Sequence, residues 1–472
     1  MKFRLICLMV TVLAAQLAAQ SADTAWVRVY GAVNSAMGSD LCVDHDGNVI
    51  VAGGAKTLKY AANGELHWVG DYGGQYIGVD GLNNIIVGAY WGYPNPVYRV
   101  IKYLPSGDTA WVRTYDGPIH SQAFPFGMVV DEAGNSYITG EAVAEGGDGV
   151  YGTVKYLPNG DTAWARIYNG APTDWDRPLA IAIDKLGNVY VTGYSRIGVA
   201  AAATVKYYPN GDTAWVRRFS TTWTEGHHIA VDESGNVFVS IWNNSYKAIK
   251  YDKDGNLLWT GTLGGGEVSV DAAGNSYFAY AWSGLGVVKY LPNGDTAWTR
   301  EYTSPLDPSD RVSDLTTDAS GNSFVTGYGY QQLAEDDRAT DYVTIKYDTN
   351  GNPDWIKRFD GIAHLEDRSM AIAIDQSGCV FVTGGSMAGS GRYDVATIKY
   401  QPSTPVCGDI DGFGSVDISD VVYLLSYIFL GGTPPLPLSS GSVNCDQDID
   451  ISDVVYLILF IFSGGFPPCA GC

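Results

Sequence analysis

Residues 183–193 read IDKLGNVYVTG, and residues 203–207 read ATVKY. In the turn D-x-x-G-N, the Asp184 carboxylate can accept hydrogen bonds from backbone amides two or three residues on, and Gly187 tolerates the left-handed conformation that closes a tight hairpin. After the turn, Val189 and Val191 alternate with a tyrosine and a threonine, which is the two-residue period of a β-strand. The stretch therefore predicts strands joined by hairpin turns.

The same unit recurs along the chain. Each turn is followed by a strand that ends in Lys-Tyr; a turn such as LPNGDTAW then leads in most units to a strand headed by tryptophan. We expect these tryptophans and Lys-Tyr pairs to pack each repeat unit against the next. Successive turn aspartates are 36 to 57 residues apart, close to the length of a four-stranded propeller blade. The eight repeat aspartates are Asp44, Asp80, Asp131, Asp184, Asp232, Asp271, Asp318 and Asp375.

The two ends of the repeat region complement each other. The unit that ends at Tyr400 lacks its own tryptophan strand, whereas DTAWVRVYG, with Trp26, stands alone near the N-terminus. A linear stack would leave strand edges exposed, and a ring closed by the N-terminal strand removes them. The sequence therefore predicts an all-β fold over residues 21–400, an eight-bladed β-propeller of four-stranded antiparallel blades.

These residues resemble the SBBP β-propeller repeats, whose units carry the core D-x-x-G-N-x-Y-V-T-G followed by T-x-K-Y. The resemblance covers roughly residues 23–400 and is strongest at residues 184–193 with 203–207 and at residues 318–327 with 344–347. It implies a propeller fold. Members of the family are found in bacterial surface and secreted proteins, so the resemblance implies an exported protein without implying an activity.

The N-terminus predicts export. A basic start, MKFR, precedes the apolar run LICLMVTVLAAQLAA, and small residues follow near a cleavage point, so residues 1–20 are expected to be a signal peptide and the protein secreted, extracellular or at the cell surface. No later apolar run reaches the roughly 20 residues that a transmembrane helix needs. The net charge of −22 argues against nucleic acid as a partner.

A short tail follows the repeats. Residues 401–406 form a proline-containing linker, and the octapeptide DISDVVYL then occurs twice within residues 407–472, which predicts two similar half-domains with short apolar helices. Four of the six cysteines that remain after signal cleavage lie here and permit disulfides in any of three pairings. These four are Cys407, Cys445, Cys469 and Cys472.

Acidic residues precede each copy of the octapeptide at alternating positions, as in a twelve-residue calcium loop. Carboxylate and carbonyl oxygens in this pattern are the ligands that Ca²⁺ prefers, so the tail is expected to bind Ca²⁺. Phe413, Ser442 and Gln447 depart from the loop pattern. The expected ligands are Asp409, Asp411, Ser415, Asp417 and Asp420 in the first loop and Asn444, Asp446, Asp448, Asp450 and Asp453 in the second.

The tail is similar to a type I dockerin, which has two such loops, each followed by a helix. That resemblance implies a small all-α domain that folds on calcium and docks to a cohesin-like partner. It also implies that loop positions 10 and 11 contribute to partner choice. Here these positions are Ile418, Ser419, Ile451 and Ser452.

The propeller sequence predicts no catalytic residue and no organic cofactor. The adjacent histidines His227 and His228 point to opposite faces of a strand, which disfavours a shared metal site, and we expect them to be ordinary surface residues. Asp-Arg pairs recur just before three blades and can either hold a ligand at the ring centre or bridge neighbouring blades, of which bridging is favoured. They are Asp176 with Arg177, Asp310 with Arg311 and Asp367 with Arg368.

The function hypothesis that follows is a secreted, non-catalytic binding protein. Its propeller recognises a glycan, peptide or protein, and its tail docks to a cohesin-like partner in a calcium-dependent way. The alternative is an extracellular carbohydrate-active enzyme, a hydrolase or lyase, with the propeller as catalytic domain. A quinoprotein dehydrogenase is disfavoured because the chain has no vicinal Cys-Cys pair.

Overall fold

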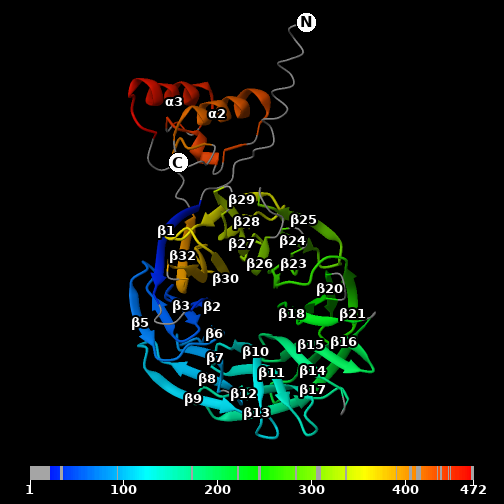
Figure 1. Cartoon of the computed structure of the whole chain (residues 1–472). Coiled ribbons are helices and arrows are strands. Elements are labelled where there is room, and N and C mark those ends of the chain that lie inside the picture. Colours follow the sequence, from blue (N-terminus) through cyan, green and yellow to red (C-terminus); the bar gives the residue numbers. More distant parts are fainter. Residues whose placement is uncertain are drawn as a thin grey trace. The chain divides into compact units, whose positions relative to one another are not determined.

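The strands of the repeat region form eight four-stranded antiparallel sheets, the blades, which follow one another around a ring (Figure 1). This confirms the predicted eight-bladed β-propeller. The computed structural model describes residues 22–31, 36–92, 94–171, 174–220, 223–242, 246–281, 284–304, 310–334, 337–389, 391–402, 407–410, 416–432, 434–435, 438–444, 446 and 448–468. The predicted signal peptide, residues 1–20, lies outside these residues.

Blades are numbered in chain order, and the first strand given for each is the innermost. Blades 1 to 4 are β2–β5 (Gly38–Val43, Val49–Gly53, Thr57–Tyr60, Leu66–Gly70), β6–β9 (Tyr76–Val79, Ile85–Trp91, Val97–Tyr103, Thr109–Tyr115), β10–β13 (Ala123–Val130, Ser136–Val143, Gly149–Tyr156, Thr162–Tyr168) and β14–β17 (Asp176–Ile183, Val189–Ile197, Val199–Tyr207, Thr213–Phe219). Blades 5 to 8 are β18–β21 (Glu225–Val231, Val237–Trp242, Tyr246–Tyr251, Leu257–Gly261), β22–β25 (Val268–Val270, Ser276–Tyr280, Leu285–Tyr290, Thr296–Tyr302), β26–β29 (Arg311–Thr317, Ser323–Ala334, Asp337–Tyr347, Pro353–Phe359) and β30–β32 with β1 (Asp367–Ile374, Val380–Met387, Tyr393–Pro402, Ala22–Tyr30).

The repeat aspartate closes the turn between the first two strands of a blade. In blade 4, Asp184 Oδ1 accepts hydrogen bonds from the amides of Leu186 and Asn188 at 3.0 and 2.9 Å. Asp184 Oδ2 accepts from the Asn188 side chain at 2.7 Å and from the Tyr190 hydroxyl at 2.9 Å. Gly187 has a φ of 78°, as the predicted tight turn requires. These two amides belong to residues two and four positions after Asp184, whereas two or three positions were expected.

The repeat tryptophans join each blade to the next. Trp164 of blade 3 donates from Nε1 to the Pro209 carbonyl of blade 4 at 3.1 Å, and its ring centroid lies 6.0 Å from that of Tyr207. Gly211 turns beneath this indole with a φ of 87°, and a Cβ there would lie 2.8 Å from the Trp164 ring. The predicted packing role is therefore confirmed. The same indole bond joins Trp26 to Ala62, Trp68 to Pro105, Trp111 to Pro158, Trp215 to Lys253, Trp259 to Pro292 and Trp298 to Thr349.

The ring closes as predicted, with the N-terminal strand β1 as the outermost strand of blade 8. Strand β1 pairs with β32, so that one blade combines both ends of the repeat region. Trp26 Nε1 from β1 and Lys399 Nζ from β32 both donate to the Ala62 carbonyl of blade 1 at 3.1 Å. Blades 8 and 1 are thus joined by the same bonds as the other neighbours.

The tail forms two helices, α2 (Ile418–Leu430) and α3 (Ile451–Ser463), and a short 3₁₀ helix, η1 (Leu438–Gly441). Their buried apolar residues pack together in one small core, which the apolar helix sequences predict. No described helix is both long and apolar enough to span a bilayer. Cys407 is disulfide-bonded, Cys42 and Cys379 are free thiols, and Cys445, Cys469 and Cys472 lie outside the described residues.

Candidate functional site

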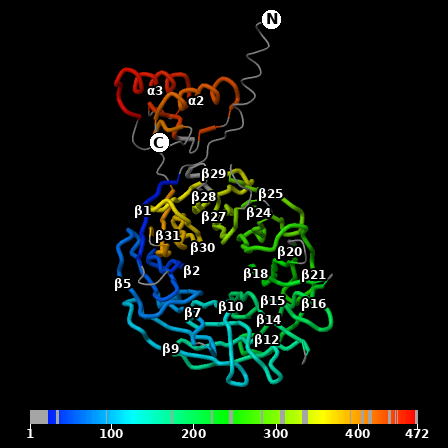
Figure 2. The backbone as a smooth tube through the Cα atoms, viewed as in Figure 1, coloured from blue at the N-terminus to red at the C-terminus, as the bar shows by residue number. Residues whose placement is uncertain are grey.

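The innermost strands of the blades face the centre of the ring (Figure 2). They are β2, β6, β10, β14, β18, β22, β26 and β30, and each lies against the next around the ring. In six of them, a β-bulge directly precedes one equivalent residue, which we call the inner position. A bulge re-aims the side chain that follows it, and bulges are frequent beside functional sites.

The inner position is four residues before each repeat aspartate and faces the same point on the second strand of its blade. Asp40 of blade 1 pairs with Ala52, for example, and Asp314 of blade 7 pairs with Thr326. Charged or hydrogen-bonding side chains occupy it in blades 5, 6, 7, 1 and 2. The eight inner residues, from blade 1 to blade 8, are Asp40, Tyr76, Gly127, Ala180, His228, Glu267, Asp314 and Ala371.

Two inner aspartates clamp neighbouring innermost strands. Asp40 Oδ2 accepts a hydrogen bond from the Ile77 amide of blade 2 at 2.9 Å. Asp314 Oδ2 accepts in the same way from the Ile372 amide of blade 8 at 2.8 Å. Each carboxylate therefore satisfies a backbone group that the innermost strand leaves without a partner in its own sheet.

The carboxylates at the inner position share one electrostatic environment. Burial raises the pKa of Asp40 to about 7, against the hydrogen bonds from two backbone amides, and the charge of Glu267 raises it further. Burial and then the charge of Glu267 raise the pKa of Asp314 well above its usual range. Burial lowers the pKa of His228, but the charge of Glu267 and its contact with His228 Nδ1 at 2.9 Å outweigh this, so the net direction is upward.

A pocket of about 470 Å³ opens beside His228 and Glu267. It spans blades 5, 6 and 7 where β18 and β26 begin, which places it at one end of the ring centre. The lining combines charges with aromatic rings. It includes Glu225, His228, Trp242, Glu267, Tyr280 and Arg311.

The histidine pair behaves only partly as predicted. His227 Nε2 lies 3.5 Å from Glu225 Oε2, whereas His228 Nδ1 lies 2.9 Å from Glu267 Oε2, so the two rings have separate partners. Both histidines nevertheless line the pocket, which corrects the expectation that they are ordinary surface residues. The inner-position register, which needs the bulge in β18, brings His228 to the ring centre.

The Asp-Arg pairs fix the loops that connect blades. In each pair the aspartate accepts a hydrogen bond from a backbone amide six residues earlier, at 2.5 to 2.6 Å, and so pins the connecting loop. The bonds are Gly170 to Asp176, Ser304 to Asp310 and Gly361 to Asp367.

The arginines of these pairs differ from one another. The Arg177 guanidinium lies 4.3 Å from the Phe126 ring and 3.7 Å from Glu141, both in blade 3, which agrees with the favoured bridging role. Arg368 similarly lies 5.5 Å from the Tyr328 ring of blade 7. Arg311 instead is exposed and lines the pocket.

In the tail, both copies of the octapeptide fold identically at the start of a helix. Asp417 caps α2 and accepts from the Ser419 amide at 2.8 Å, while Asp420 is fully buried and accepts from the Asp417 amide at 2.8 Å. Asp450 and Asp453 make the same capping box at α3. The sequence duplication is therefore a structural duplication.

The remaining expected calcium ligands are only partly described. Asn444 donates from Nδ2 to Asp446 Oδ2 at 2.8 Å, and the Asn444 amide donates to Asp453 Oδ1 at 3.2 Å. Asp448 is exposed, and its amide donates to Asp446 Oδ1 at 3.0 Å. Asp409 precedes Ile410, whose amide donates to Asp420 Oδ1 at 2.5 Å. Asp411 and Ser415 lie outside the described residues.

Comparisons with known proteins agree with the fold. The SBBP β-propeller repeat model matches residues 164–197. The chain carries an SBBP β-propeller repeat. No curated protein matches it in sequence.

Solved structures match this SBBP-repeat chain at low similarity. A eukaryotic initiation factor is 10% identical with a TM-score of 0.44, covering 78% of this chain and 86% of its own. The C-terminal WD40 domain of Sif2 is 12% identical with a TM-score of 0.43, covering 63% and 78%. A gluconolactonase from Xanthomonas campestris is 12% identical with a TM-score of 0.34, covering 82% and 92%. Likeness at this level carries no functional argument.

Sequence reasoning on the SBBP repeat missed the inner position. No single residue type is common to all eight inner positions, so they do not appear as a sequence motif. Their constant distance of four residues from the repeat aspartate is the signal that finds them, because a repeat that keeps its register keeps its geometry.

Proposed function

We propose that the protein is a non-catalytic, extracellular binding protein. Its propeller takes a ligand in the pocket beside His228 and Glu267, and its tail docks to a cohesin-like partner in a calcium-dependent way. The observation that carries the proposal is the pocket, which is lined by charged and aromatic side chains.

The chemistry of the pocket favours a glycan or a polar peptide. Trp242, which is partly exposed, offers an aromatic face on which a sugar ring stacks, and Glu225, Glu267 and Arg311 provide charged hydrogen-bonding groups around it. Tyr280 is buried and contributes to the apolar wall. The pocket combines convergent polar groups with an apolar wall, as ligand sites generally do.

The residues of the tail fit calcium by their donor chemistry. The described candidates, which include Asp417 and Asp450 at the helix starts and Asp446 and Asp448 in the second loop, offer oxygen atoms only. Ca²⁺ takes six to eight oxygen ligands. When bound, the ion would order each loop against the helix that follows it.

The proposed docking residues are accessible. Ile418 and Ile451 are 51% and 50% exposed and occupy equivalent places on α2 and α3. Ser419 and Ser452 beside them are exposed as well. Further exposed apolar residues continue along both helices, including Val422 and Phe462. The proposed occupant is one cohesin-like module, which covers such a face and desolvates its apolar side chains.

Binding of the full chain to an array of oligosaccharides and peptides tests the pocket. We expect Trp242→Ala and Glu267→Gln to lose binding at least about tenfold, while Trp91→Ala, an exposed tryptophan of blade 2 outside the pocket lining, leaves it unchanged. Equal binding by all four proteins would reject the pocket. Appearance of cleaved glycan would instead support the enzyme alternative, so products are analysed on the same samples.

Binding of the full chain to an immobilised type I cohesin, in Ca²⁺ and in chelator, tests the tail. The expected result is binding in Ca²⁺ that the double variant Ile418→Arg, Ile451→Arg abolishes, because two charges then face an apolar partner surface. Binding in chelator, or binding by the double variant, would contradict calcium-dependent docking through these residues.

A further inference from the structure

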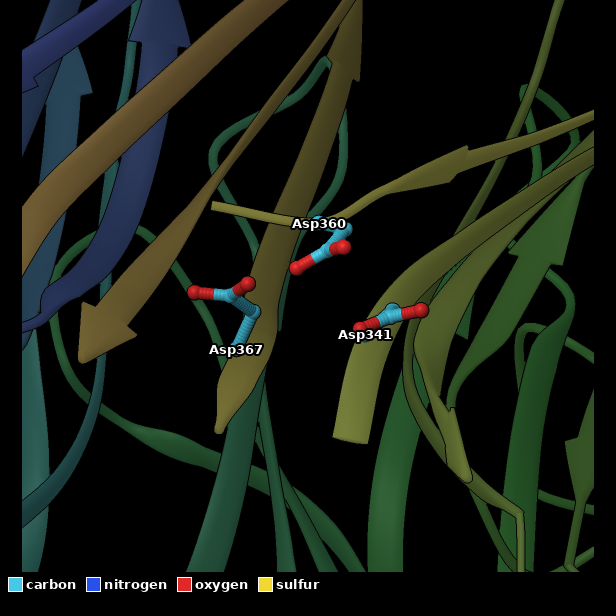
Figure 3. A group of neighbouring side chains, drawn as sticks. All are labelled: Asp341, Asp360 and Asp367. Carbon is cyan, nitrogen blue, oxygen red and sulfur yellow. The ribbon is translucent and has the colours of Figure 1, made fainter. Parts of the chain in front are cut away.

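Three carboxylates meet between blades 7 and 8 (Figure 3). Asp341 belongs to β28, Asp360 to the loop after β29, and Asp367 is the first residue of β30. One carboxylate oxygen from each lies within 4.8 Å of the others. A single ion at a calcium–oxygen distance of roughly 2.3–2.6 Å reaches oxygens that far apart.

Asp341 is buried without the partners that a buried carboxylate needs. Its side chain is 1% exposed, and neither of its oxygens accepts a hydrogen bond. One oxygen of Asp360 and one of Asp367 are likewise buried without a hydrogen bond. Arg358 forms an ion pair with Asp341, but its Nε lies 3.7 Å from Asp341 Oδ2, beyond hydrogen-bonding distance. A buried carboxylate without hydrogen-bond donors is unfavourable when it is ionised, because it loses its hydration without a replacement.

The electrostatics of the cluster point the same way. Burial, and then the charge of Asp360, raise the pKa of Asp341 to about 7. Asp367 also has a raised pKa because of burial, although the amide of Gly361 donates to it at 2.5 Å. The three groups therefore repel one another when ionised.

A loop of the same kind connects blades 2 and 3, and it forms without such a cluster of carboxylates. This loop reads DGPIHSQA over residues 116–123, and the loop between blades 7 and 8 reads DGIAHLED over residues 360–367. His120 and His364 both have a φ of 52°, and both place Nδ1 within 2.9 Å of the aspartate four residues earlier. The two loops thus share their length, the conformation of the histidine and the internal hydrogen bond, although Gly117 has a φ of 85° and Gly361 does not have a positive φ.

Between blades 2 and 3 the two buried aspartates are replaced by apolar residues. Val97 corresponds to Asp341, since each lies six residues before the tyrosine of its Lys-Tyr pair. Ala123 corresponds to Asp367, since each lies eight residues before a repeat aspartate. The fold therefore tolerates apolar residues at both places, and loop structure does not explain the pair of buried carboxylates.

We propose that Asp341, Asp360 and Asp367 bind one calcium ion that fastens blade 7 to blade 8. The donors are oxygen atoms only, two of the three carboxylates are fully buried, and the half-buried Asp360 leaves a route from solvent. This site is independent of the tail loops and of the pocket.

Thermal unfolding of the full chain, followed by tryptophan fluorescence in Ca²⁺ and in chelator, tests the site. All thirteen tryptophans lie between residues 26 and 355, so this signal reports the propeller and not the tail. We expect Ca²⁺ to raise the propeller Tm by about 2 °C or more, by linkage of binding to folding. Asp341→Val, which copies blade 2, is expected to remove that rise and to unfold at a higher Tm than the wild type in chelator.

Two controls sharpen the test. Asp176→Ala removes the equivalent loop bond at the junction of blades 3 and 4, where Val150 of blade 3 stands at the place of Asp341, and is expected to keep the full calcium response. Calorimetry of the full chain is expected to find one calcium fewer in Asp360→Asn than in the wild type, which covers the case in which Asp341→Val does not fold. The proposal would be overturned if Ca²⁺ left the wild-type Tm unchanged, if Asp341→Val kept the calcium-dependent rise in Tm, or if Asp360→Asn bound as many calcium ions as the wild type. An equal rise in Tm with Mg²⁺ would also overturn it.

Discussion

The outer rim of the propeller and its inner position follow opposite rules. On the rim, a tryptophan of one blade donates to a turn carbonyl of the next, and the pattern repeats around the ring from Trp26 to Trp298. At the inner position, an equally fixed backbone register carries aspartate, tyrosine, glycine, alanine, histidine and glutamate. Uniform residues at the rim hold the ring together, and varied residues at the centre give one sector a distinct chemistry.

The largest effect is expected at the rim. Trp164→Ala removes the bond to the Pro209 carbonyl and the contact with the Tyr207 ring, and it leaves a cavity between two blades. The free energy of unfolding should fall by about 3–5 kcal/mol. Denaturant unfolding followed by far-UV circular dichroism measures it. The control Trp223→Ala removes an exposed ring that contacts Tyr194 and should cost about 1 kcal/mol or less. Equal costs for the two variants would break the comparison.

A smaller loss is expected in the turn that sets the register. Asp184→Ala deprives the amides of Leu186 and Asn188 and the Tyr190 hydroxyl of their acceptor. We expect a loss of about 2 kcal/mol, because several bonds to one charged acceptor disappear together. The same denaturant experiment measures it, and a loss below that of Trp223→Ala would show that the turn does not need its aspartate.

At the inner position, removal of a charge is expected to stabilise the fold. Burial raises the pKa of Asp40 to about 7 in the folded state, above its ordinary value of 3.8, so the folded protein binds more protons than the unfolded chain between these values. Stability contributed by Asp40 is therefore lost as the pH rises from about 4 to 7. Asp40→Asn should raise the free energy of unfolding at pH 8 by about 1 kcal/mol and flatten this pH dependence. Unfolding at pH 5 and pH 8 tests it; a loss of stability at pH 8 would contradict it.

The smallest effect on stability is expected for Glu267→Gln, within about 0.5 kcal/mol at a pH above the folded-state pKa of His228, where the two side chains do not form an ion pair. The pKa of His228, which Glu267 raises, should fall in this variant. In the wild type that pair stabilises the fold below the unfolded histidine pKa and ceases to do so as the pH rises through the folded value. An NMR titration of the His228 ring measures the change, and an unaltered titration would show that the pair is not coupled.

The sequence predicted the rim because each of its residues acts through local chemistry that repeats. A single repeat unit is enough to recognise the turn at Asp184, the alternation at Val189 and Val191, and the tryptophan that heads the outer strand. The tryptophan strand at Trp26, which is separated in sequence from the unit that lacks it, also indicated how the ring closes. In the tail, duplication predicted two equal helix starts, which Asp417 and Asp450 confirm.

What stayed hidden depends on contacts between units. His228 and Glu267 are 39 residues apart and Asp341 and Asp367 are 26 apart. The sequence singled out His228 and Asp367, but nothing in it indicated which residues they meet. They meet because bulges and connecting loops bring neighbouring blades together at fixed registers. Sequence alone thus determined the number of blades, their turns and their closure, since these follow from periodic local preferences. The tertiary structure decided where charge gathers, because that depends on which blades become neighbours.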